Sequence, residues 1–201
     1  MLRLFRRRRS RAAAPVLTAR SEAVAAVRVE LSALTPEPVP FLGQAAYLTL
    51  VLFENAGRAV ASAPATGSKS ELGRVAARLL EAHQALVAEL RALGADPVDA
   101  MDPFRPALDE YQGRVQGADW AETLVTCYLT TGFLGDLFTG LAAGLPPGLA
   151  ERVALLLDVD ASEEVLEAQL RDLIRRSPRI ASRLALWGRR LIGDTMLVAR
   201  S

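Results

Sequence analysis

The chain contains one cysteine, Cys127, one histidine, His83, and few aromatic residues, which make up 5% of the sequence. One thiol cannot form a disulfide framework or a cysteine zinc site, and a thiol in apolar surroundings is a poor nucleophile. The lack of disulfides indicates a reducing cytoplasm. The apolar residues are mostly Ala, Leu and Val, a mixture that favours helices over strands.

Strong net charge and long uncharged runs are also absent. The formal net charge is +1, so no global charge indicates a nucleic-acid or membrane partner. The longest weakly charged stretch, residues 123–149, contains Asp136 and ends at Pro146 and Pro147. We expect a buried bundle helix there rather than a membrane span. The AAAPVLTAR segment after Arg11 is too short and mixed for the apolar region of a signal peptide.

The first 40 residues divide into two parts. Residues 1–14 form a basic arm, and mutual repulsion of its charges predicts disorder. Residues 15–40 combine a short helix, with Val24, Val27 and Leu31 on one side, and the rigid linker TPEPVP. The arm either contacts phosphates of RNA or lipid, or is a solvated tail. Its arginines are Arg3, Arg6, Arg7, Arg8, Arg9 and Arg11.

Residues 41–201 are expected to form one helical bundle. Apolar residues recur at steps of three and four, and no alternating strand pattern appears. Ser70 is the expected N-cap of the second long helix, and Gly94 is its stop. Residues 95–111, with three prolines, form a crossover with about one helical turn. The predicted fold is an all-α four-helix bundle with extra N- and C-terminal helices. The expected long helices span residues 41–62, 71–93, 119–141, 148–176 and 179–200.

Two polar residues stand out against the apolar helices. His83 lies within a stripe that includes Leu79 and Leu86, so it is either a hydrogen-bonded core residue or a ligand aimed into the bundle. Glu54 directly follows a fully apolar run. Such a carboxylate is costly to bury unless it is paired or binds a metal, but it can also pair with Arg58 on the surface. Both alternatives stay open for each residue.

Four features of the chain outline a ferritin-like di-iron bundle. They are the helix order, an early crossover, a Glu on the first core helix and a His on the second. The chain resembles a bacterial ferritin-like family related to the tRNA hydroxylases that oxidise methylthio-isopentenyl adenosine. The resemblance covers roughly residues 40–196. The segments that carry it are FLGQAAYLTLVLFENAGR, LLEAHQALVAELRALGADPVDAMDPF, DWAETLVTCYL and SRLALWGRRLIG.

The resemblance implies a metal site that this chain completes only in part. Glu54 matches the first-helix carboxylate and His83 the second-helix imidazole. Leu80 replaces the expected Glu, and Glu81 lies about 100° round the helix. The position at which the third helix should carry an acid falls near Thr130 or Thr131. On the fourth helix Asp160 and Glu163, at i and i+3, replace Glu-x-x-His, although this segment can equally be a solvated helix start capped by Asp160 or Ser162.

The replaced metal-ligand positions predict a ferritin-like bundle with an incomplete metal site and a non-catalytic binding or structural role. The buried His83 then finds a carboxylate, such as Glu54, or a backbone partner. The alternative is a non-haem iron oxygenase, di-iron or mononuclear, that resembles the tRNA hydroxylases. It would use Glu54, His83 and Glu163 as ligands, with iron as the one candidate cofactor. A third hypothesis is a bundle that dimerises through the helix of Trp187.

Overall fold

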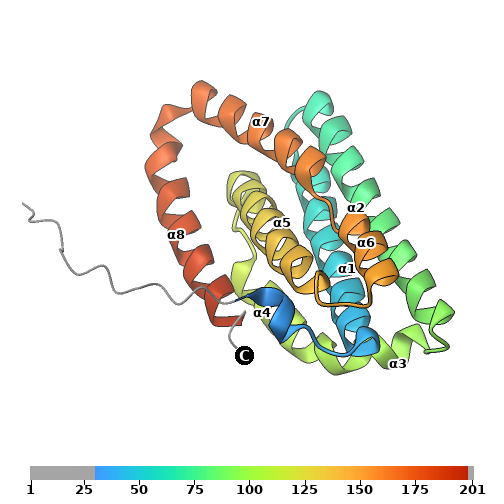
Figure 1. The fold of residues 1–201 in the computed structure, drawn as a ribbon. Coiled ribbons are helices and arrows are strands. Elements are labelled where there is room, and N and C mark those ends of the chain that lie inside the picture. Colours follow the sequence, from blue (N-terminus) through green and yellow to red (C-terminus); the bar gives the residue numbers. More distant parts are fainter. Residues whose placement is uncertain (1–29, 199–201) are drawn as a thin grey trace, which may run out of the picture.

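The computed structural model describes residues 30–198, and side chains as far as residue 195. This part of the chain is all-α: helices and their connections account for it, and no β-strand occurs within it. The arginine arm and residues 15–29 of the expected first helix lie outside the described residues. Four long helices form the bundle, and a fifth long helix runs beside it (Figure 1). These are α1 (Pro38–Ser62), α2 (Thr66–Ala92), α5 (Trp120–Ala142), α7 (Asp160–Arg176) and α8 (Ala181–Val198).

Helices α1 and α2 form a tightly packed hairpin. Helix α1 begins at Pro38, three residues before the expected start, because proline is well suited to the first helical position. Helix α2 begins at Thr66 after Ala65, so the expected N-cap at Ser70 is wrong and Ser70 lies inside the helix. Gly94, with φ of +77°, ends it as expected. The Ala95 amide bonds to the Leu90 carbonyl there, the pattern of a Schellman cap.

The crossover is more helical than the sequence indicated. The expected single turn is in fact three consecutive short helices, each with a proline at its start. The amides in the first turn of a helix have no hydrogen-bond acceptor within that helix. A proline, which lacks an amide hydrogen, is therefore tolerated there. The crossover packs on α1 so closely that a Cβ at Gly43 would overlap the Ala100 carbonyl. The three are α3 (Pro97–Met101), η2 (Asp102–Phe104) and α4 (Arg105–Val115).

Helix α5 is the central helix of the fold. The Asp119 carboxylate caps it by accepting a hydrogen bond from the Glu122 amide at 2.9 Å. Contacts to α1, α7, α8 and the 3-10 helix η1 (Leu31–Leu34) surround it. Among the described helices it alone is long and apolar enough to cross a membrane, but 56% of its most apolar window is buried inside the protein. It is a core helix of the bundle.

The expected helix over residues 148–176 is two helices, α6 (Pro147–Leu156) and α7. The Asp158 carboxylate accepts a hydrogen bond from the Asp160 amide at 3.0 Å, which supports a turn instead of a continuous helix. Val159 then packs directly on α5, since a Cβ at Gly135 would lie 2.6 Å from its Cγ2 atom. Close packing therefore fixes where α7 begins. After α7 the 3-10 helix η3 (Pro178–Ile180) turns the chain into α8.

Candidate functional site

His83 makes a backbone contact with the neighbouring helix. It lies half-buried on α2, with its Nδ1 atom 2.8 Å from the Ala46 carbonyl oxygen of α1. A carbonyl oxygen only accepts, so Nδ1 carries the proton and donates. This is the hydrogen-bonded arrangement that the sequence left open, with a backbone partner in place of a carboxylate. The imidazole thereby ties α2 to α1.

Glu54 is half-exposed on α1 and faces the crossover. It accepts a hydrogen bond from Gln112 Nε2 of α4 at 2.9 Å, and an Arg58 guanidinium nitrogen lies 3.8 Å from the same carboxylate oxygen. The surface pairing with Arg58 is therefore present. Ala46 and Glu54 are eight positions apart, about 12 Å along α1. The structure gives His83 and Glu54 different partners at different levels of α1, and the expected buried pair between them is wrong.

The other candidate ligands are dispersed. Glu81 is exposed on α2, and Asp160 is exposed at the first position of α7. Glu163 is half-buried beside Gly132 of α5. Burial and then the nearby Asp136, Asp160 and Glu167 carboxylates raise the pKa of Glu163. The structure therefore brings Glu163 together with another acid of α5, but on the outer side of that helix.

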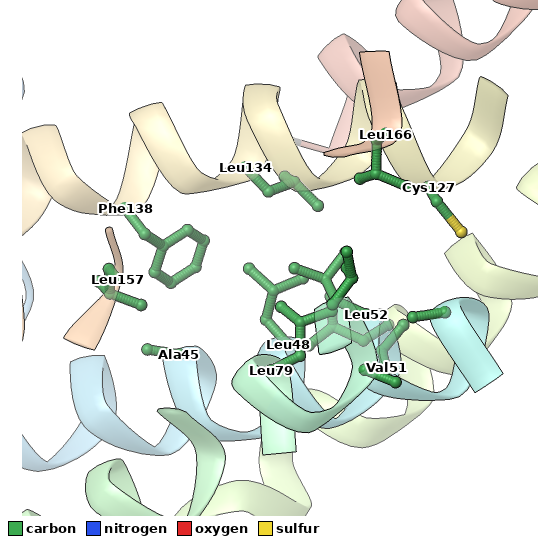
Figure 2. Packing of buried hydrophobic residues seen from close by; sticks show 14 of the residues in the cluster. Ala45, Leu48, Val51, Leu52, Leu79, Cys127, Leu134, Phe138, Leu157 and Leu166 are labelled. Carbon is green, nitrogen blue, oxygen red and sulfur yellow. The ribbon is translucent and has the colours of Figure 1, made fainter. Parts of the chain in front are cut away.

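The centre of the bundle is filled by apolar side chains. Apolar side chains of α5 and α7 point towards those of α1 and α2 (Figure 2). The threonines nearby are turned to their own helices: Thr49 donates to Ala46 at 2.9 Å and Thr130 to Thr126 at 2.7 Å. The residues that fill the centre include Leu48, Leu52, Leu79, Leu134, Phe138 and Leu166.

A family model described as a ferritin-like domain of actinomycetes matches residues 37–201. The chain belongs to this ferritin-like family. No curated protein matches it. The matched region begins at the residue before α1 and includes every bundle helix, so the observed helical architecture and the family agree.

The ferritin-like fold implies a metal centre between the core helices, and the residues present do not fit one. A di-iron site needs several carboxylates and imidazoles that converge from four helices. Here leucine and phenylalanine occupy that space. Within residues 30–195, no group of three or more His, Cys, Asp or Glu side chains is suited to hold a metal ion.

Polar contacts that fasten the first turns of α5 in this ferritin-like bundle were not expected from the sequence. Arg183 of α8 binds Asp119 at 2.7 Å and Glu122 at 3.0 Å, both at the start of α5. Trp187 Nε1 donates to Thr126 Oγ1 at 3.2 Å. These contacts fasten α8 to α5. They join residues about 60 positions apart in the chain, which no local spacing pattern can reveal.

Cys127 takes no part in a reactive arrangement. It is buried, with 2% of its surface exposed, and burial raises the pKa of its thiol to about 12. At neutral pH it is therefore a protonated, apolar core side chain. The structure gives no support to nucleophilic chemistry at this position.

An open groove lies on the outer face of α5, between α7 and α8. Figure 1 shows these two helices diverging on either side of α5. The groove encloses about 280 Å³, and two of its apolar side chains, Phe133 and Ile192, are 39% and 47% exposed. We call it the α5 groove. Its lining residues used below are Leu129, Gly132, Phe133, Asp136, Glu163 and Ile192.

Proposed function

We propose that this ferritin-like protein is a non-catalytic bundle that acts by binding or as a structural component. The observation that carries the proposal is the apolar packing of Leu48, Leu79, Leu134 and Phe138 where the fold family places metal ligands. A metal ion there would have to displace close-packed hydrocarbon, and the described side chains that fill this centre include no carboxylate or imidazole.

The arrangement of the remaining carboxylates supports the same proposal. Glu54 is engaged by Gln112 and Arg58, and Glu163 faces the outer side of α5. The two acids thus belong to different surfaces and cannot share one ion. The ferritin-like fold is retained as a scaffold while its interior serves packing alone.

Metal loading tests the proposal. The purified full chain is incubated anaerobically with Fe(II), and separately with Mn(II) and Zn(II), desalted, and analysed for metal per chain. We expect less than about 0.1 equivalent of each metal, because a site short of ligands binds too weakly to survive desalting. The Glu54→Gln/His83→Leu double variant is the control. Any residual metal that it shares with the wild type is adventitious.

The alternative is a non-haem iron oxygenase that resembles the tRNA hydroxylases. The family membership keeps this candidate in view, since ferritin-like folds commonly hold two irons. Close to two irons per chain would overturn the non-catalytic proposal and direct attention to oxygen reactivity with tRNA. About one iron, lost in the double variant, would indicate a mononuclear site on Glu54 and His83.

A further inference from the structure

The face of α5 that lines the α5 groove at Leu129, Phe133 and Asp136 continues beyond the groove to Leu137 and Gly140. Leu129, Phe133, Asp136, Leu137 and Gly140 follow at steps of four, three, one and three, the spacing of a single helix side. All five are half-buried or exposed. A mainly apolar strip of this length on a core helix is normally covered by another element.

The strip leads directly to the point where the chain enters the bundle. A Cβ at Gly140 would lie 2.6 Å from Leu31 Cδ1, so Leu31 packs on the end of the strip. Ser32 and Thr35 lie against Gly144, and the Thr35 hydroxyl donates to the Leu141 carbonyl. From Leu31 onward the chain therefore advances in the same direction as α5. A straight continuation of this direction backwards from Leu31 would follow α5 towards Asp136 and Phe133.

We propose that residues 15–29 of this chain form an amphipathic helix that docks in the α5 groove and extends the contact made by Leu31. Leu17, Val24 and Val27 recur at the helical spacing that ends in Leu31. Fifteen helical residues span about 22 Å, and α5 from Leu129 to Gly140 spans about 17 Å. The segment is thus long enough to cover the strip. This inference does not depend on whether the bundle holds a metal.

The charges of the groove and the segment are complementary. Asp136 and Glu163 have no basic partner among residues 30–195, and the pKa of Glu163 is raised by burial and by neighbouring carboxylates. Residues 15–29 contain Arg20, Arg28 and Glu22, so the segment carries a net charge of +1. Arg28 precedes Leu31 by three positions, and Asp136 precedes Gly140 by four. A parallel helix would therefore bring Arg28 to the level of Asp136, where a cation is favoured.

Cysteine trapping in the full chain tests this register. Val24 precedes Leu31 by seven positions and Phe133 precedes Gly140 by seven, so the pair Val24→Cys/Phe133→Cys should lie within disulfide reach. The matched control is Val24→Cys/Leu155→Cys, because Leu155 is 77% exposed on α6. Under mild oxidation we expect the first pair to form an intramolecular disulfide at least about tenfold faster than the control pair. Buried Cys127, with its raised pKa, is left in place.

Each other outcome would overturn the proposal. Equal rates for the two pairs would show that residues 15–29 do not rest in the groove. A disulfide-linked dimer through the Val24 and Phe133 positions would assign the groove to a second copy of the chain instead. Non-reducing electrophoresis separates these products.

Hydrogen exchange gives a second test that needs no cysteine. Val27→Asp places a charge on the apolar side of the segment, whereas Ala25→Asp places it about 120° away from the centre of that side. In the full chain we expect Val27→Asp to raise amide exchange in residues 15–29 by about tenfold or more, and Ala25→Asp by less than about twofold. Equal exchange in the two variants would contradict docking through this side.

Discussion

At the scale of single residues, His83 forms a structural contact between two helices. Its Nδ1 atom donates to the Ala46 carbonyl, which is an interhelical hydrogen bond between α2 and α1. Without the imidazole ring, the Ala46 carbonyl still accepts a hydrogen bond within α1, so no polar group is left without a partner. The contact therefore contributes the modest free energy of one hydrogen bond and some packing.

We expect His83→Leu to lower the free energy of unfolding by about 0.5–1.5 kcal/mol. The Glu54→Gln change should add independently, because Glu54 contacts Gln112 and Arg58 rather than His83. Urea unfolding of both single variants and the double variant measures this. A coupling of about 1 kcal/mol or more would show that the two side chains interact, contrary to the observed geometry.

A further residue-scale prediction concerns two glycines with opposite surroundings. A Cβ at Gly135 would lie 2.6 Å from Val159 Cγ2, whereas one at Gly73 of α2 would meet nothing within 4 Å. We expect Gly135→Ala to cost about 1–3 kcal/mol by overpacking, and Gly73→Ala to stabilise by about 0.5–1 kcal/mol through helix propensity. Thermal melts compare the two. A stabilising Gly135→Ala would mean that α7 can move away from α5 at little cost.

At the scale of elements, the sequence predicted helices better than their ends. The boundaries near Asp119 and Gly94 were found because capping residues act locally. The break before Asp160 was missed because it depends on the contact between Val159 and Gly135, which joins residues 24 positions apart. The helical crossover was missed because its prolines indicate both turns and helix starts. Glu54 and His83 lie on α1 and α2, but periodicity cannot specify which level of a neighbouring helix a side chain contacts.

The tie between α1 and the crossover gives a pH-dependent prediction. The Tyr47 hydroxyl donates to Asp109 at 2.6 Å, and burial, then this hydrogen bond, raises the pKa of Tyr47 from 10.0 to about 12. The folded state therefore favours the protonated phenol. Its contribution is complete below pH 10.0 and is lost as the pH rises through about 12.

We expect Tyr47→Phe to lower the free energy of unfolding at pH 7 by about 1 kcal/mol, since Phe keeps the ring but removes the hydroxyl. Wild type should lose this advantage over the variant as the pH rises from 10.0 towards 12. Urea unfolding of both proteins at several pH values measures the difference. A difference that stays constant over that range would show that the phenol does not titrate as the structure indicates.

At the scale of the whole molecule, α8 and the N-terminal residues are the parts whose role the bundle alone does not define. Trp187 is half-buried, bonds to Thr126 and has the Arg190 guanidinium 5.3 Å from its ring centroid. These contacts use the indole within its own chain. Dimerisation through this helix stays a prediction, and Leu186, which is 65% exposed, is the side chain through which it would act.

Two truncations separate the basic arm from the segment that follows it. Both leave intact the matched ferritin-like region, residues 37–201. Removing residues 1–14 should leave the melting temperature unchanged, because the predicted arm is a charged tail outside the core. Removing residues 1–29 should lower it by about 4 °C or more and increase self-association, since Phe133 and Ile192 would lose the cover proposed for them. Calorimetry and sedimentation of the full chain and both truncations measure these effects. Equal melting temperatures for the two truncations would argue that residues 15–29 contribute nothing to the bundle, whereas a large loss on removing residues 1–14 would place the arginines themselves in a stabilising contact.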